Sequence, residues 1–196
     1  MQYIDLLHEI RDLGFEDDQV FSEYNSIIRN AITRACRFIA TIIKAPTGVI
    51  PLDLTDDTVY TDTGRYDLAE LSKDDDGNVR FDSVDRIVEA TDTGGKTFLR
   101  YDIEQDKVLV LDPSIRTKLT VYYNERILPL PSDVSDSYEI QVVYPCEPLV
   151  ALLAAHYVWL DDDERKAIIY WNEFDQLRAE IEAKAFKLKG RIVGGF

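Results

Sequence analysis

The sequence has no long apolar run and no signal-like start. No stretch of it approaches the roughly 18 consecutive apolar residues that a membrane-spanning helix needs. Its first residues, MQYIDLLHEIRD, carry acids from the fifth position onward and contain no basic segment. A secretory signal peptide begins with positive charge, so none is predicted. We therefore expect no membrane segment, and folding in a reducing cytoplasm.

Cysteine and histidine are both scarce. The two cysteines, Cys36 and Cys146, lie far apart in the sequence, which is typical of buried free thiols rather than of a disulfide. The two histidines, His8 and His156, fall in different predicted helices and lack the close spacing of a zinc site. His156 follows two alanines in an apolar stretch, where a core histidine with one hydrogen-bond partner is expected.

Two short motifs resemble ligand-binding loops but lack required residues. Gly94-Gly95-Lys96-Thr97 ends like a phosphate-binding loop, yet Ala90 stands where the first glycine is needed and a strand is predicted afterwards. The segment from Asp74 to Asn78 resembles a calcium loop, but alignment on its glycine puts Ser72 and Ser83 where carboxylates are required. A hairpin turn and a solvated β-turn are predicted instead. We expect no catalytic residue, no cofactor site and no metal site, and hence no enzyme.

Basic residues are outnumbered by acids. The chain has 22 Lys and Arg against 37 Asp and Glu, a net charge of −15. Tight binding to duplex DNA needs clustered bases, because phosphate contacts supply most of the affinity. We therefore expect no tight nucleic-acid binding, although an acidic surface can line a passage along which DNA slides. Hydrophobic residues make up 45% of the chain, enough for a sizeable core.

The N-terminal part of the chain is predicted to form two helices. Apolar residues recur at helical spacing over residues 1–12 and, more regularly, over about Asp18–Lys44. No acid occurs between Glu23 and Asp53, and the polar side of the second helix carries a basic stripe: Arg29, Arg34, Arg37 and Lys44. This stripe is either a solvated helix face or a seam against an acidic neighbour, such as the acidic β region of the next copy in a homo-oligomer.

Residues 49–144 change to strand-like alternation and turn signals. Strands are predicted over 49–50, 59–66, 79–88, 97–103, 107–111 and 119–123. Residues 53–112 hold 17 acids and 7 bases, a local net charge of −10, so this region carries most of the negative charge. The segment 128–131 alternates Leu and Pro and is predicted to be an extended connector.

Two more helices are predicted after Pro145 and Pro148. Residues 149–160 are apolar nearly all round, so that helix should be buried. The helix over residues 164–187 has an apolar face that includes Ile168 and Trp171. A basic, glycine-rich tail follows and is either a frayed end or a flexible segment that docks into a partner. Its candidate interface residues are Lys184, Lys187, Leu188, Lys189, Arg191, Ile192 and Phe196.

The predicted fold is α+β, with a four-helix domain and an inserted antiparallel β lobe. Two N-terminal and two C-terminal helices form the helical domain, over residues 1–48 and 145–188. The β lobe covers residues 49–144, and residues 189–196 form the docking tail.

This order of elements resembles the head-to-tail adaptor (connector) proteins in the necks of tailed bacteriophages. The resemblance runs over most of the chain and is one of architecture rather than of a residue motif. It rests on the paired N-terminal helices, on the hairpin RYDIEQDKVLVLDPSIRTKLTVYYNERI, and on the helical pair PCEPLVALLAAHYVWLDDDERKAIIYWNEFDQLRAEI with its charged turn at 160–164. The β insertion is longer here than the family needs.

The resemblance implies a structural protein of the virion neck, assembled in the host cytoplasm. Identical subunits, commonly twelve, would form a ring beneath the portal protein and above the tail or a further neck protein. DNA would pass through the ring without specific binding, and the C-terminal segment would reach the portal. Alternative interpretations are another tail-completion or stopper protein, an acidic inhibitor that mimics DNA, and an enzyme with an unrecognised site.

Overall fold

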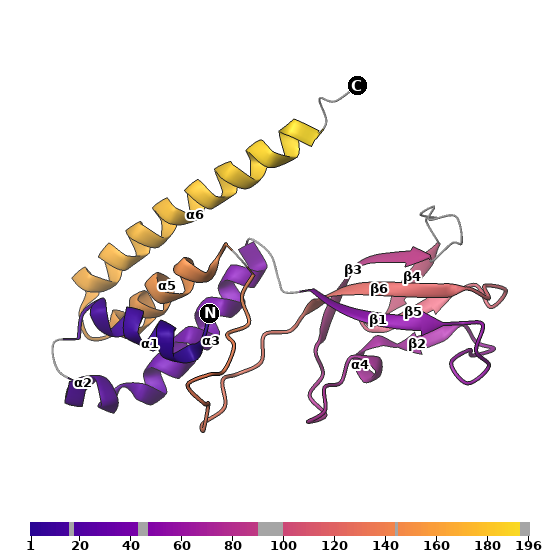
Figure 1. The fold of residues 1–196 in the computed structure, drawn as a ribbon, viewed down its shortest axis with the longest axis horizontal. Helices are drawn as coiled ribbons and strands as arrows, with labels where there is room; N and C mark the ends of the chain where they lie inside the picture. Colours follow the sequence, from indigo (N-terminus) through magenta and orange to yellow (C-terminus); the bar gives the residue numbers. More distant parts are fainter. Residues whose placement is uncertain (16–17, 43–46, 90–99, 144, 193–196) are drawn as a thin grey trace. The chain divides into compact units, whose positions relative to one another are not determined.

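The chain folds into two compact units. The computed structural model describes residues 1–15, 18–42, 47–89, 100–143 and 145–192. The helical unit combines Met1–Ala45 with Ile127–Phe196, and the β unit is the intervening segment Pro46–Arg126. Helices build the first unit and strands dominate the second, so the predicted α+β class is confirmed (Figure 1). Within the described ranges, no helix is both long and apolar enough to span a membrane.

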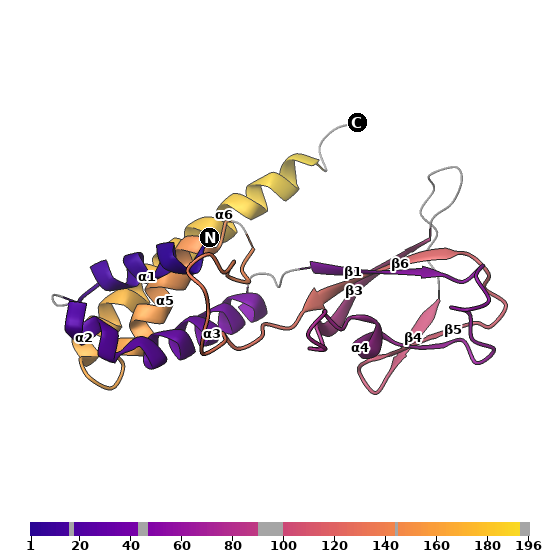
Figure 2. The ribbon, with the colours of Figure 1, turned by 60° about the horizontal axis from the view of Figure 1, so that its bottom comes forward.

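Helix α5 lies at the centre of the helical unit. The described part of that unit contains α1 (Tyr3–Asp12), α2 (Asp18–Glu23), α3 (Asn25–Ile42), α5 (Glu147–Trp159) and α6 (Glu164–Ile192). Seven of the α5 side chains are buried, namely Leu149, Val150, Ala151, Leu153, Ala154, Ala155 and Val158. Because these residues point in all directions, α5 needs cover on several sides, and it contacts α1, α3 and α6 (Figure 2). The predicted buried helix is thus confirmed.

Residues 127–143 follow the β region in sequence but belong to the helical unit. Ile127 and Ile140 are buried in the helical core, and the carbonyl of Tyr138 accepts the N–H of Tyr3 at 2.8 Å. The boundary predicted after residue 144 is therefore wrong, and the β unit ends at Arg126. Local sequence shows that a segment is extended, but it does not show which unit the segment packs against.

The single helix predicted over Asp18–Lys44 is divided at Tyr24 into α2 and α3. The Tyr24 ring packs 5.4 Å from the Phe15 ring, and its hydroxyl donates to the carboxylate of Asp162. Asp162 lies 138 residues away and Phe15 lies outside the helix itself, so helical periodicity does not reveal the break. The described helical unit consequently has five helices instead of the predicted four.

Helix α6 runs from Glu164 to Ile192, beyond its predicted end at Lys187. The predicted tail from residue 189 onward is therefore helical as far as Ile192, and residues 193–196 lie outside the described ranges. A glycine costs a helix only about 1 kcal/mol relative to alanine. Gly190 is accordingly too weak a signal to end a helix of this length.

The β unit contains two three-stranded antiparallel sheets, as the predicted antiparallel lobe requires. In spatial order, one sheet is β1 (Thr47–Asp53), β6 (Lys118–Glu125) and β3 (Phe81–Glu89); the other is β2 (Arg65–Asp67), β5 (Val108–Leu111) and β4 (Tyr101–Glu104). The short helix α4 (Leu68–Leu71) contacts β3 and β5. Alternate residues of β1 and β6 face one core, where Ile50 pairs with Val121 and Leu52 with Leu119.

Carboxylate-centred turns organise the loops of the β unit. In three of them a serine or threonine donates both its N–H and its hydroxyl to the aspartate two residues earlier: Asp53–Thr55, Asp56–Thr58 and Asp112–Ser114. The strand predicted over residues 59–66 is largely wrong, because only Arg65 and Tyr66 of it pair, as part of β2. The Asp56–Thr58 turn directly precedes the predicted strand.

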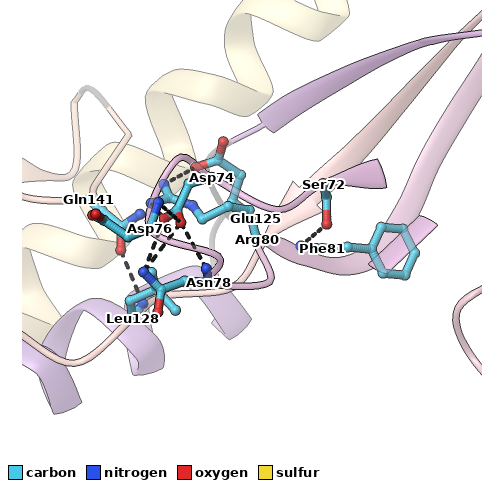
Figure 3. Close-up of polar contacts among 9 residues, drawn as sticks. All are labelled: Ser72, Asp74, Asp76, Asn78, Arg80, Phe81, Glu125, Leu128 and Gln141. Carbon is cyan, nitrogen blue, oxygen red and sulfur yellow. Dashed lines mark hydrogen bonds and ion pairs between the residues drawn. The ribbon is translucent and has the colours of Figure 1, made fainter. Parts of the chain in front are cut away.

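Arg80 joins a fourth acidic turn to strand β6. Its guanidinium donates to the Glu125 carboxylate at 3.0 Å and lies 3.8 Å from the Asp74 carboxylate (Figure 3). Asp74 in turn accepts the backbone N–H groups of Asp76 at 3.1 Å and of Asn78 at 2.8 Å. The segment resembling a calcium loop is thus a turn whose first carboxylate is already occupied by protein donors.

Gly64 provides a test of packing at one end of the β2–β5 pair, where it lies opposite Leu111. It has φ +62°, its carbonyl accepts the N–H of Leu111 at 2.9 Å, and a Cβ there would lie 2.2 Å from the Leu111 carbonyl oxygen. Gly77 has φ +81° with open space around it. Gly64→Ala should therefore destabilise the β unit by about 3 kcal/mol, and Gly77→Ala by about 1 kcal/mol. Hydrogen exchange of the β5 amides measures both losses, and equal losses would contradict the predicted clash.

The aspartate turns predict that the β unit loses stability in acid. The hydroxyl and N–H of Ser114 lower the pKa of Asp112, and the N–H and hydroxyl of Thr58 lower the pKa of Asp56. A carboxyl with a lowered folded-state pKa stabilises the fold above its unfolded pKa of about 3.9. That contribution disappears as the pH falls through the lower folded value. Protection factors of the strand amides, which compare each exchange rate with the intrinsic rate at the same pH, should therefore fall between about pH 5 and pH 2, and less steeply in Asp112→Asn; identical profiles would contradict this account.

Candidate interaction surface

The predicted basic stripe on α3 does not form one free face. Arg29 donates to the carbonyl of Ser132, and Nε of Arg37 donates to the carbonyl of Ile127 at 3.2 Å. Both arginines thereby hold the extended segment 127–143 against α3. Lys44, the fourth member of the stripe, lies outside the described ranges.

Arg34 is used differently from Arg29 and Arg37. Its guanidinium carbon lies 4.0 Å from the centroid of the Tyr157 ring of α5, in a cation–π arrangement. Ile27, Asn30, Ala31 and Tyr157 line a shallow groove beside it. A stacked guanidinium is held in a fixed plane while its N–H groups stay available to a partner.

Aromatic side chains extend this surface from α5 to α6. The His156 ring lies 5.2 Å from both the Tyr157 ring and the Trp171 ring, and Trp171 lies 6.2 Å from Phe38 of α3. His156 has the single hydrogen-bond partner expected of it, because its Nδ1 lies 2.9 Å from the carbonyl oxygen of Ala167. Rings from three helices therefore meet where α3, α5 and α6 converge.

Several apolar side chains of this surface remain in contact with solvent. Ile27 is 46% exposed, Ile168 is 52% exposed and Trp171 is 36% exposed. Ile168 precedes Trp171 by one helical turn, so the two are neighbours on the surface of α6. We call the combined surface the Arg34 patch; it comprises Ile27, Arg34, Phe38, His156, Tyr157, Ile168 and Trp171.

The sequence did not indicate the aromatic part of this patch. Ile168 and Trp171 fit the apolar face of the predicted fourth helix, and that face is buried only in part, at Ala167, Phe174 and Ile181. A signal was present in the extra width of the apolar face, which exceeds what one packed neighbour covers. Whether Ile168 and Trp171 stay exposed depends on how much of α6 is covered by α3 and α5, which local sequence does not show.

The candidate residues near the C-terminus are only partly placed. Lys184 lies on α6 and is exposed. Lys187, Leu188, Lys189, Arg191 and Ile192 belong to the α6 backbone, and Phe196 lies outside the described ranges. The structure therefore gives no common surface that joins them to Arg34.

Both cysteines lie in the core of the helical unit. Burial raises the pKa of the Cys36 thiol to about 12, so this thiol stays protonated at neutral pH. Both cysteines are free and buried, as predicted. Within the described residues, no group of three or more His, Cys, Asp or Glu side chains is arranged to hold a metal ion. No known protein family matches the chain, and no curated protein matches it either.

The two kinds of stripe arginine should differ in their contribution to stability. Removing Arg37 leaves the Ile127 carbonyl without its donor, so Arg37→Met should cost about 1.5–3 kcal/mol. Arg34→Met removes only a solvent-exposed cation–π contact, worth about 0.5–1 kcal/mol. Urea unfolding followed by tryptophan fluorescence reports on the helical unit, because Trp159 and Trp171 both lie there. An Arg34 variant less stable than the Arg37 variant would contradict this assignment.

Proposed function

We propose that the protein is a structural subunit of a tailed-phage neck, where copies of it assemble into a head-to-tail adaptor ring between portal and tail. The observation that carries the proposal is the Arg34 patch, an exposed surface that combines Trp171, Tyr157 and Arg34 with two isoleucines. Tryptophan, tyrosine and arginine are the residues most enriched at the energetic centres of protein interfaces. The surface is therefore suited to binding another protein.

The architecture supports the same function. An antiparallel β unit is inserted between two groups of helices, in the order on which the resemblance to head-to-tail adaptors rests. The net charge of −15 also suits a subunit of a DNA channel, because an acidic wall repels phosphate and lets DNA move without sticking. Neither feature requires a catalytic group.

The role of the Arg34 patch in self-assembly has a matched test on α6. Ile168 and Ile169 are the same residue type with nearly equal exposure, 52% and 53%. Helical geometry turns Ile169 away from Trp171, whereas Ile168 lies beside it. Ile168→Glu should weaken self-association at least roughly tenfold by placing a charge in the interface, and Ile169→Glu should leave it nearly unchanged. Sedimentation velocity over a concentration series measures both.

The outcome for the wild-type protein decides the proposed function itself. Native mass spectrometry of the purified chain, alone and with a portal protein, should show a closed ring of many identical subunits that attaches to the portal. A strictly monomeric chain that binds no portal would contradict the proposal. If Ile168→Glu and Ile169→Glu had equal effects, the Arg34 patch would not be part of the subunit interface. The proposal of a ring would still stand.

A further inference from the structure

Arg34 has no acidic partner within the described residues, although the chain is rich in acids. Among those residues its guanidinium makes one charge-specific contact, with the Tyr157 ring, and Arg34 is exposed. The other two described arginines of the stripe donate to backbone carbonyls. A planar guanidinium fixed on an aromatic ring is arranged to take a carboxylate through two parallel hydrogen bonds.

The groove beside Arg34 favours a short acidic segment of protein. Asn30 lies one helical turn before Arg34 and carries an amide that can donate to a second carboxylate oxygen. Ile27 and Ala31 provide an apolar wall, which lowers the local dielectric and strengthens a charged hydrogen bond. No acid occurs in α3, so nothing on that helix competes for the arginine.

The β unit supplies an acidic segment of this kind. Residues 46–126 hold 18 acids and 10 bases, an excess of 8 negative charges. Most of its described carboxylates already accept a hydrogen bond or pair with a base: Asp53, Asp56, Asp57, Asp67, Glu70, Asp74, Asp85, Glu104, Asp112 and Glu125. The carboxylates left over are the ones available to another molecule.

Asp75 and Asp76 are the adjacent pair among those remaining carboxylates. Both are exposed, and within the described residues neither side chain has a partner. Asp74 fixes the backbone of their turn, because its carboxylate accepts two of the turn's backbone N–H groups and pairs with Arg80 (Figure 3). A rigid turn loses little conformational freedom on binding, which favours it over a mobile acidic loop.

We propose that the groove at Arg34 of one copy binds the Asp75–Asp76 turn of a neighbouring copy. This inference rests on the proposed self-assembly and names the groups that meet. The groove and the turn are different surfaces of one chain, so the contact is heterologous. Repeated heterologous contacts close into a ring when the rotation between neighbours divides a full turn.

A charge-reversal series tests the pairing in the full-length protein. Arg34→Glu alone, and the double change Asp75→Lys with Asp76→Lys, should each weaken self-association at least roughly tenfold, because each places like charges in contact. Combining all three changes in one chain should restore most of the affinity, since every copy then carries both reversed surfaces. Arg100→Glu makes the same charge change at an exposed position of the β unit, which contributes no residue to the Arg34 patch, and should have little effect.

Sedimentation velocity gives the affinities, and tryptophan fluorescence with circular dichroism checks that each variant is folded. Weakening by Arg34→Glu no greater than by Arg100→Glu would overturn the pairing while leaving wild-type ring formation intact. A triple variant in which the losses of affinity simply add would show that Arg34 and the Asp75–Asp76 turn do not meet in the self-assembled contact, and would also overturn the pairing. A wild-type chain that never self-associates would remove both this pairing and the proposed ring.

Discussion

Helix α5 must be covered, and much of the helical unit follows from that requirement. Its buried residues face α1, α3 and α6, which come from both ends of the chain. Burying one leucine or valine side chain contributes about 1.5–3 kcal/mol, so the four buried leucines and valines make α5 a main source of the unit's stability. The same packing places α3 beside the extended segment 127–143, whose carbonyls then take the donors of Arg29 and Arg37.

The cover over α5 is incomplete where α3 and α6 converge. Tyr157 and His156 are half-buried there; the His156 ring lies beside Tyr157 and Trp171, and Trp171 lies beside Phe38. Exposed aromatic rings next to exposed isoleucines bury their surface when another chain covers them, and this gain drives association. The Arg34 patch is therefore the site that we propose for the next subunit, and its arginine would favour a partner surface of negative charge.

The β unit reaches stability by different means. Its core is small, and its loops are fixed by carboxylates that accept backbone N–H groups and hydroxyls, as at Asp56 and Asp112. Each such turn uses one negative charge internally. The acids that remain, above all Asp75 and Asp76, are available for contacts outside the unit. The acids of the β unit thus fall into two groups: those that fix its turns, and those that remain exposed at its surface.

Local periodicity was enough to predict much of the fold. It indicated the buried helix near residues 149–160 and antiparallel strands close to β3, β5 and β6, while the wide separation of Cys36 and Cys146 indicated free buried thiols. It failed where the deciding partner is distant. The helix is divided at Tyr24, whose hydroxyl donates to Asp162, 138 residues away, and such a contact leaves no trace in the spacing of apolar residues.

The candidate site divides in the same way. The sequence by itself determined that α3 carries a row of bases without acids, because charge and helical phase are properties of the local chain. Only the tertiary structure decided that Arg29 and Arg37 bind backbone carbonyls while Arg34 stacks on Tyr157. It also decided that Ile168 and Trp171 stay exposed. The physical reason is that a side chain's partners depend on which segments pack beside it, and residues 127–143 and α5 are brought to α3 by burial of the common core.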